Sequence, residues 1–154
     1  LADTDINEAI TDILMILGEE IEKRRITVLT ELGAVPLFRA DKRQIEQVID
    51  NILLNAMQAM TSGGEIRIST SRNGHTVSIG IRDNGPGIPR DVRSRIFDPF
   101  FTTKPIGEGT GLGLSICAGI VSAHGGTIQV ESEAGNGAAF LITLPLHRHE
   151  ARTT

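Results

Sequence analysis

Hydrophobic residues recur at helical spacing from the start of the chain. They begin directly after Asp5, which can cap a helix with Glu8 as its reciprocal partner, and they continue to Ile21. The residues over 26–35 then carry a strand-like set of apolar side chains, which Pro36 closes. This opening predicts a helix followed by a strand or two.

The most regular helical pattern runs from Asp41 to about Met60. Asp41 and Gln44 repeat the capping arrangement, and Ser62 with the two glycines that follow it ends the helix. The apolar face comprises Ile45, Val48, Ile49, Ile52, Leu53, Ala56 and Met60. A helix with one apolar face of this width packs on a hydrophobic core.

Alternating strands make up much of the remainder. Two of them, over 66–70 and 77–81, are separated by Asn73 and Gly74, a pair that strongly favours a hairpin turn. The later elements are predicted to be a short helix over 89–96, a helix over 112–124, and strands at Thr127–Ser132 and Ala138–Leu144.

Hairpins dominate this order of elements, and helices interrupt them. The sequence therefore predicts an α/β (α+β) sandwich, in which helices cover one face of a mixed, mostly antiparallel sheet. We expect one domain over residues 1–146 and a disordered tail over residues 147–154. Between Asp83 and Gly113 the chain is rich in glycine and proline, so a long loop is expected there.

Composition narrows the classes of function. The 154 residues are 40% hydrophobic and 22% charged with a net charge of −4, which fits a soluble globular protein. No excess of positive charge is available for sequence-independent nucleic-acid binding. The longest aliphatic run, Ile13–Leu17, is far shorter than the ~20 residues of a membrane helix, so no membrane contact is expected. The lone cysteine, Cys117, excludes an internal disulfide framework and is expected to be a buried hydrophobe.

Asn51 and Asn55 lie four residues apart and therefore share one face of the predicted helix. At ~100° per residue they fall at the margin of its apolar stripe, where a side chain faces a cleft beside the core. A carboxamide in this position can offer its oxygen to a hard cation and its nitrogen to a phosphate. The alternative is a pair of surface asparagines, although asparagine is unfavourable within a helix.

The alternation of the second hairpin strand carries Asp83 to the inward face at the end of that strand. A buried carboxylate is costly unless it accepts good hydrogen bonds, and the exocyclic amine of adenine is a suitable donor. Gly85 and Gly87 follow on either side of a proline, which lets the backbone approach a flat ligand closely. The alternative for Asp83 is an Asx turn at the start of the loop.

Two further segments indicate phosphate binding. The glycines from Gly107 to Gly113 lead directly into a helix, whose free N–H groups and dipole favour an anion. The segment over 96–104 holds three of the five phenylalanines, together with Lys104, inside the long loop. This arrangement predicts a lid with aromatic anchors and a lysine that reaches the cleft.

One protein family has these elements in this order. From about Asp5 to Pro145 the chain resembles the ATP-binding catalytic domain of bacterial sensor histidine kinases, with a motif sequence closest to that of their nitrogen-regulation branch. Those domains share a Bergerat-type ATPase fold with gyrase, the heat-shock chaperone and the MutL mismatch-repair protein. The matching motifs are an N box (Asn51–Ala56), a first glycine box (Asp83–Ile88), an F box (Phe97–Lys104), a second glycine box (Gly109–Ser115) and a closing glycine motif (Gly135–Phe140).

The resemblance implies a kinase that transfers the γ-phosphoryl group of ATP to a histidine, with Mg²⁺ as cofactor. It implies that Asn55 binds the metal with support from Asn51, that Lys104 acts with both asparagines in catalysis, and that Asp83 binds adenine. The other nucleotide-binding residues implied are Gly85, Gly87, Ile88, Phe97, Gly109, Thr110, Gly111, Leu112, Gly113 and Leu114.

Three features depart from the family pattern. Histidine kinases carry the phosphoacceptor histidine in a dimerisation hairpin before this domain, and no histidine here precedes His75. We therefore expect that hairpin to lie upstream of Leu1, and the chain to be a cytoplasmic, monomeric fragment that does not phosphorylate itself. Gln58 stands where many relatives have a basic residue, a charge that Lys104 can supply, and Ala138 stands where threonine is common. The implied partners are the hairpin of a parent kinase, which can be membrane-anchored, and a response regulator.

Two other functions stay open at this point. A gyrase-like or MutL-like hydrolase resembles this chain but has a glutamate in the place of Asn51, where it activates water as a general base. Because Asn51 cannot accept a proton, hydrolysis is disfavoured. A non-catalytic nucleotide sensor or docking module is the second alternative, and the joint presence of Asn55, Asp83 and Lys104 counts against it.

Overall fold

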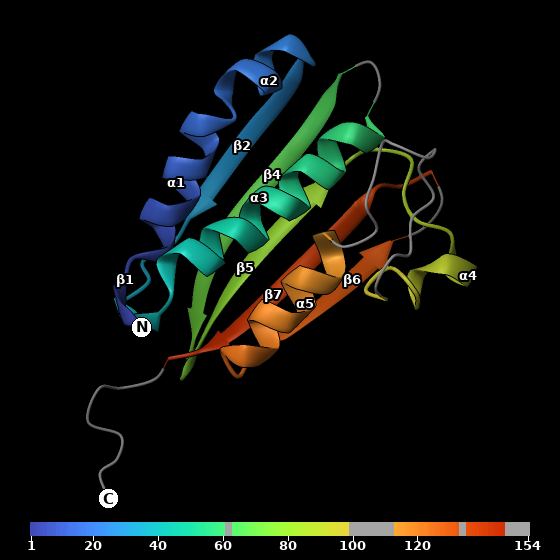
Figure 1. Cartoon of the computed structure of the whole chain (residues 1–154). Coiled ribbons are helices and arrows are strands. Elements are labelled where there is room, and N and C mark those ends of the chain that lie inside the picture. Colours follow the sequence, from blue (N-terminus) through green and yellow to red (C-terminus); the bar gives the residue numbers. More distant parts are fainter. Residues whose placement is uncertain (61–62, 99–112, 133–134, 147–154) are drawn as a thin grey trace, which may run out of the picture.

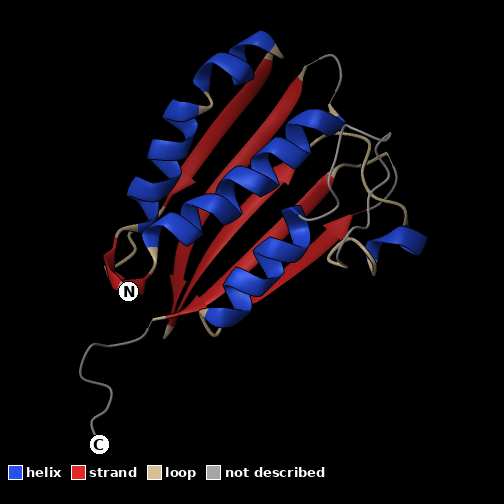
Figure 2. Ribbon diagram, viewed as in Figure 1, coloured by secondary structure: helices blue, strands red, loops and turns tan. Residues whose placement is uncertain are grey.

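Helices cover one face of a twisted β-sheet in this protein (Figure 1). The computed structural model describes residues 1–60, 63–98, 113–132 and 135–146. Within these residues a five-stranded sheet has the order β2-β4-β5-β7-β6, and β1 and β3 form a separate two-stranded sheet. Figure 2 shows the helices lying together on one side of the larger sheet. The predicted two-layer architecture is therefore confirmed.

The described helices and strands have the following bounds. The helices are α1 (Ile6–Ile16), α2 (Gly18–Lys23), α3 (Lys42–Ala59), α4 (Arg90–Arg93) and α5 (Gly113–Ala123). The strands are β1 (Ala2–Thr4), β2 (Ile26–Leu32), β3 (Phe38–Ala40), β4 (Gly64–Asn73), β5 (Thr76–Asp83), β6 (Thr127–Ser132) and β7 (Ala138–Pro145). In the described part of the chain no helix is both long and apolar enough to cross a membrane.

Both predicted helix caps are present. The Asp5 carboxylate accepts hydrogen bonds from the backbone N–H groups of Asn7 and Glu8, at 3.0 and 3.3 Å. Asp41 accepts one from the N–H of Gln44 at 3.2 Å, so each cap satisfies a free donor of the first turn. The Glu8 side chain forms an ion pair with Lys42 at 3.0 Å. The first helix, expected to continue to Ile21, is instead interrupted after α1 and resumes as α2 at Gly18, a residue that weakens a helix interior.

The centre of the fold is the apolar face of α3. All seven predicted residues of its stripe are buried, as is Met57. This face packs against α1 and α5 as well as against β5 (Figure 1). Complete burial of each isoleucine or leucine side chain contributes ~1.5–3 kcal/mol, so this helix supplies a large part of the core energy.

The sheet is mixed, as predicted. β2 pairs with β4 in parallel, and the pairs β4–β5, β5–β7 and β6–β7 are antiparallel. Ile68, Ile81 and Phe140 lie side by side across the three central strands and are buried beneath the helices. Gly74, with a φ of 61°, forms the predicted hairpin turn between β4 and β5. The three-residue strands β1 and β3 were not predicted, because neither is long enough to show alternation.

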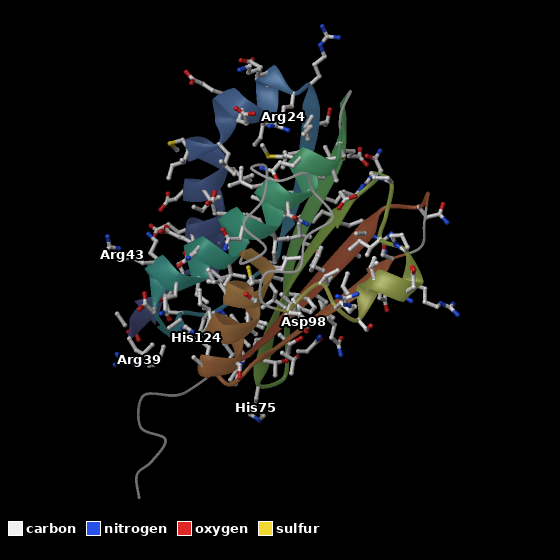
Figure 3. All side chains as sticks on the ribbon, turned by 45° about the vertical axis from the view of Figure 1, so that its right-hand side comes forward. Arg24, Arg39, Arg43, His75, Asp98 and His124 are labelled. Atoms are coloured by element: carbon white, nitrogen blue, oxygen red, sulfur yellow. The ribbon has the colours of Figure 1, made fainter. Side chains whose placement is uncertain are left out.

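A histidine joins two helices of the helical layer. His124 follows the last residue of α5 and lies close to the start of α3 (Figure 3). Its Nε2 accepts a hydrogen bond from the backbone N–H of Asp41 at 3.1 Å, and its Nδ1 lies 2.9 Å from the carbonyl oxygen of Ile120. Since a backbone N–H can only donate, Nδ1 carries the ring hydrogen and donates it to Ile120. The imidazole therefore links the end of α5 to the cap residue of α3.

His124→Ala should lower the free energy of unfolding by about 1–2 kcal/mol, because the Asp41 N–H would lose its acceptor. Urea denaturation followed by circular dichroism measures this change. The matched control is His75→Ala, since His75 is exposed at the β4–β5 turn (Figure 3) and its loss should cost less than about 0.5 kcal/mol. Equal effects of the two substitutions would contradict the linking role.

Candidate functional site

The predicted site residues that the structure describes lie where α3, the end of β5 and the start of α5 come together (Figure 1). Asn51 and Asn55 are both half-buried on α3, beside the fully buried stripe, as their helical spacing predicts. The Asn51 Nδ2 donates a hydrogen bond to the carbonyl oxygen of Gly113, the first residue of α5, at 3.3 Å. The amide margin of α3 therefore adjoins the N-terminal end of α5.

Beneath Asn51 lies the single thiol of the chain. Cys117 on α5 is fully buried, and its Sγ lies 3.7 Å from the carbonyl oxygen of Val48 on α3. Burial raises the pKa of this thiol to about 11, although a hydrogen bond with the Asn51 side chain opposes the shift. A thiol with so high a pKa is almost entirely protonated near neutral pH and is a poor nucleophile, so Cys117 is the packing residue that the sequence predicted.

Asp83 is the buried carboxylate of the site. It is the last residue of β5 and is 9% exposed. Its Oδ1 accepts a hydrogen bond from the backbone N–H of Gly85 at 2.8 Å. Burial raises its pKa above 3.8, and hydrogen bonds from the N–H groups of Gly85 and Ala138 together with the charge of Arg82 act in the opposite direction. The inward position is confirmed, and the Asx-type bond to Gly85 that the alternative interpretation required is present as well.

The loop after Asp83 is held closely on the side of β4 and α3. The backbone N–H of Asn84 donates to the carbonyl oxygen of Glu65 at 3.2 Å, and its Oδ1 accepts from the N–H of Glu65 at 2.8 Å. Met60, 4% exposed at the end of α3, fills the space next to Gly85, where a Cβ would lie 3.0 Å from its Cγ. A side chain at Gly85 would thus have to displace Met60.

The turn between β6 and β7 holds the loop on its other side. Gly135 donates its N–H to the carbonyl oxygen of Pro86 at 2.6 Å. Gly137 has a φ of +79°, and a Cβ there would lie 2.1 Å from the carbonyl oxygen of Asp83. Gly137 is therefore packed directly on the backbone of the buried carboxylate, where only glycine fits, whereas Gly135 is favoured by its positive φ of +87°.

Four other predicted residues have described positions. Gly87 has a φ of +80°, in the region that favours glycine. Ile88 and Leu114 pack against the edge of the core. The ring of Phe97 meets that of Phe140 edge to face, with centroids 6.3 Å apart and an interplanar angle of 83°. Lys104, Gly109, Thr110, Gly111 and Leu112, and the part of the predicted lid that follows Asp98, lie outside the described residues, as does the tail over 147–154.

The donor set suits a magnesium ion better than a transition metal. Within the described ranges no three His, Cys, Asp or Glu side chains converge on one point. A cation beside α3 would therefore be held by the amide oxygens of Asn51 and Asn55, by phosphate oxygens and by water. Mg²⁺ is commonly bound in this way, because it keeps several waters and takes few protein ligands.

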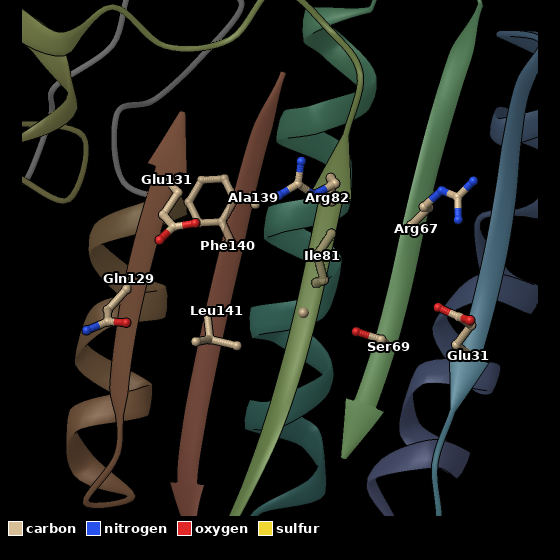
Figure 4. Close-up of a pocket in the computed structure, with 11 residues that line it drawn as sticks. Glu31, Arg67, Ser69, Ile81, Arg82, Gln129, Glu131, Ala139, Phe140 and Leu141 are labelled. Carbon is tan, nitrogen blue, oxygen red and sulfur yellow. The ribbon is translucent and has the colours of Figure 1, made fainter. Parts of the chain in front are cut away.

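A separate hollow of about 350 Å³ lies on the opposite, uncovered face of the sheet (Figure 4). Ser69 and Gly80 lie side by side at its centre, and Arg67, Arg82 and Glu131 are among the charged residues around it. None of the predicted nucleotide-binding residues that have described positions lines this hollow. It is a mixed-charge surface and is distinct from the candidate site.

Comparisons with known proteins agree with this geometry. Residues 40–148 match the family described as histidine kinase-, DNA gyrase B-, and HSP90-like ATPase. The catalytic domain of the histidine kinase ThkA is 35% identical, superposes with a TM-score of 0.85, and the match covers 94% of this chain and 95% of that domain. A second ThkA structure, in complex with the response regulator protein TrrA, is 32% identical with a TM-score of 0.81, covering 95% of this chain and 42% of that one.

The alginate biosynthesis sensor protein KinB of Pseudomonas aeruginosa is 40% identical over 95% of this chain. The chain spans only 25% of the length of that relative. The chain therefore belongs to this ATPase family, and within it is an ATP-binding catalytic domain of the bacterial sensor histidine kinase kind.

Three residues near the site were missed by reasoning from the sequence. Met60 was assigned to the core alone, Asn84 was given no role, and Ser132, which contacts the loop at Ile88, was regarded as the end of a strand. The pattern of polar and apolar residues carries no signal for such contacts, because each joins segments far apart in the sequence.

Gly137→Ala should destabilise the protein by about 3–5 kcal/mol, because the new Cβ adds both backbone strain and a collision with Asp83. Gly135→Ala is a matched control: its φ of +87° is equally unfavourable for alanine, but among the described residues no atom lies within 4 Å of the new Cβ. The control should cost only about 1–2 kcal/mol. Denaturant unfolding of both variants measures the difference, and similar losses would show that the close approach is unimportant.

Proposed function

We propose that this chain binds Mg-ATP at the site formed by α3, β5 and α5. The γ-phosphoryl group is then transferred to a histidine of the dimerisation hairpin of a parent kinase. The observation that carries the proposal is the buried carboxylate of Asp83. Burial raises the pKa of this group, so keeping it ionised inside the fold lowers the folding stability. Family membership explains that cost, since ATP binding is the shared property of these domains.

At the base end, Asp83 accepts a hydrogen bond from the exocyclic amine of adenine. Its other acceptor positions are occupied by the backbone N–H groups of Gly85 and Ala138, which orient the carboxylate without neutralising it. Gly85, Gly87 and Ile88 form the adjoining wall. Met60 fills the space beside Gly85, so the close approach of the backbone to a flat ring falls to Gly87.

At the phosphate end, the N-terminus of α5 provides the positive end of a helix dipole and the N–H groups of a first helical turn. Asn55 binds Mg²⁺, and Asn51, held by Gly113, supports the metal or a phosphate. Lys104 and the Gly109–Leu112 segment complete the phosphate site. A protein of net charge −4 needs such cations to hold a polyanion, so metal and nucleotide bind together.

Phosphoryl transfer requires positioning and charge neutralisation more than covalent participation by the protein. The Asn51 amide cannot act as a general base, and its Nδ2 donates to the Gly113 carbonyl, so the site favours transfer to an external histidine over hydrolysis. A response regulator would receive the phosphoryl group next, and the ThkA–TrrA complex supports a partner of that class. We place this activity in the cytoplasm, with the isolated chain a monomer.

Calorimetric titration with a non-hydrolysable ATP analogue, with and without Mg²⁺, tests the proposal. The chain should bind one analogue, several-fold more tightly with Mg²⁺, and Asn55→Ala should abolish that metal dependence. Gln47→Ala is the matched control, because Gln47 is an exposed amide on the same helix. No saturable binding by the unmodified chain would contradict the nucleotide site, and a metal dependence that persists in Asn55→Ala would contradict the ligand assignment.

Asp83→Asn should weaken adenosine and ATP-analogue binding by about 1–3 kcal/mol, because a charged acceptor is replaced by a neutral one. Since burial raises the pKa of Asp83 above 3.8, adenosine binding by the unmodified chain should weaken as the pH falls toward that raised pKa.

Protonation of Asp83 affects folding stability in the direction opposite to its effect on nucleotide binding. Because the pKa of Asp83 is raised in the folded state, the protonated carboxyl stabilises the fold at pH values below the unfolded-state pKa, and this contribution is lost as the pH rises through the folded-state pKa. Near neutral pH, Asp83→Asn should therefore unfold at no lower denaturant concentration than the unmodified chain. Asp3→Asn, at an exposed aspartate, is the control. Unchanged nucleotide affinity in Asp83→Asn would refute the base assignment.

A further inference from the structure

Ser132, the last residue of β6, makes two hydrogen bonds through its hydroxyl group. The backbone N–H of Ile88 donates a hydrogen bond to the Ser132 Oγ at 2.7 Å. The same hydroxyl donates to the carbonyl oxygen of Gly137, also at 2.7 Å. One serine side chain therefore joins the loop after β5 to the turn between β6 and β7, and its donor capacity is fully used.

The backbone of Ser132 is held as well. Its carbonyl oxygen accepts a hydrogen bond from the guanidinium group of Arg93 on α4, the helix that follows the loop. Three separate segments thus meet at this one residue: the loop at Ile88, the turn at Gly137 and helix α4. Ser132 is half-buried, which shields these bonds from competition with water.

The loop that Ser132 holds has no regular secondary structure between Asp83 and the start of α4. On one side Asn84 bonds to Glu65, and on the other Pro86 bonds to Gly135. The bond to Ser132 fixes the far end of the loop, beyond the last of these contacts. Without it, the backbone at Ile88 loses an acceptor supplied from outside the loop.

We propose that Ser132 is a positioning residue for the adenine end of the nucleotide site. It does not touch the nucleotide in this assignment. It acts through Ile88, by holding the loop wall at the distance from Asp83 that a purine ring requires. This inference rests on the function proposed above and adds to it a residue outside the glycine boxes.

The effect should depend on which part of the ligand is bound. Ser132→Ala should raise the dissociation constants of adenosine and of the ATP analogue by the same factor, roughly tenfold, since one backbone hydrogen bond at the base end is lost. The factor by which Mg²⁺ strengthens analogue binding should not change, because the hydrogen bonds of Ser132 go to the loop at Ile88, to Gly137 and to Arg93, and not to the asparagines proposed to hold the metal. Ser132→Thr, which keeps the hydroxyl group, should restore binding to within about threefold of the original.

The experiment is calorimetric titration of the chain with adenosine, and with the non-hydrolysable analogue with and without Mg²⁺. Amide hydrogen exchange at Ile88 without nucleotide is measured in parallel, and it should accelerate in Ser132→Ala and recover in Ser132→Thr. The matched control is Ser78→Ala, which should change none of these values. Ser78 is half-buried like Ser132, but it lies on the uncovered face of the sheet. Thermal unfolding establishes that each variant is folded at the titration temperature.

The outcomes separate this inference from the function on which it rests. An unmodified chain that binds neither ligand would overturn the proposed function and the role of Ser132 with it. Binding by the unmodified chain that is unaffected by Ser132→Ala would overturn the positioning role alone. A loss confined to the triphosphate analogue would also overturn it, because the residue would then act at the phosphate end.

Discussion

The apolar face of α3 has to be buried, and the geometry of the candidate site depends on that burial. The helix packs against the sheet, α1 and α5 at once, so neither its rotation nor its depth is free to change. Because successive side chains are about 100° apart around the helix axis, burying the apolar stripe in one direction sets the direction of every other side chain on the helix. Asn51 and Asn55 are half-buried at its margin for this reason alone. The packing of the core places both asparagines near the start of α5, and Asn51 is held there by its hydrogen bond to Gly113.

The burial of Asp83 differs from the burial of the apolar face of α3, because burying a carboxylate lowers the stability of the fold. A carboxylate that is 9% exposed would ordinarily be paired with a cation. Here its hydrogen bonds come from the backbone of Gly85 and Ala138, and the charge of Arg82 is the smallest of the effects on its pKa. A lysine or arginine in direct contact would stabilise the carboxylate but would also occupy the position proposed for an adenine amine. The backbone donors of Gly85 and Ala138 hold the group without adding a charged side chain there.

The layers, the caps and the hairpin could be predicted because each depends on residues close together in the sequence. Asp41 and Gln44, or Asn73 and Gly74, carry their structural consequences within a few positions. The inward positions of Asp83, Ile81 and Ile79 follow from the same local alternation. The parallel pairing of β2 with β4 could not be predicted, since alternation does not identify a partner strand. Nor could the contacts of Ser132 with Ile88, which join residues 44 positions apart in the chain.

The loop after β5 shows why those long-range contacts matter. It follows Asp83 directly and contains Gly85 and Ile88 but has no hydrogen-bonded ladder of its own, so its shape comes from its neighbours. Glu65 and Met60 support one side, and the β6–β7 turn supports the other. All of these supports lie in or beside the sheet layer, and none comes from a phosphate-binding residue. Under the proposed function, the base end of the site is therefore built by the fold itself, so ATP and ADP should be held alike there. On the same assignment, discrimination between them would fall to α3 and the start of α5, where the charge of the ligand differs.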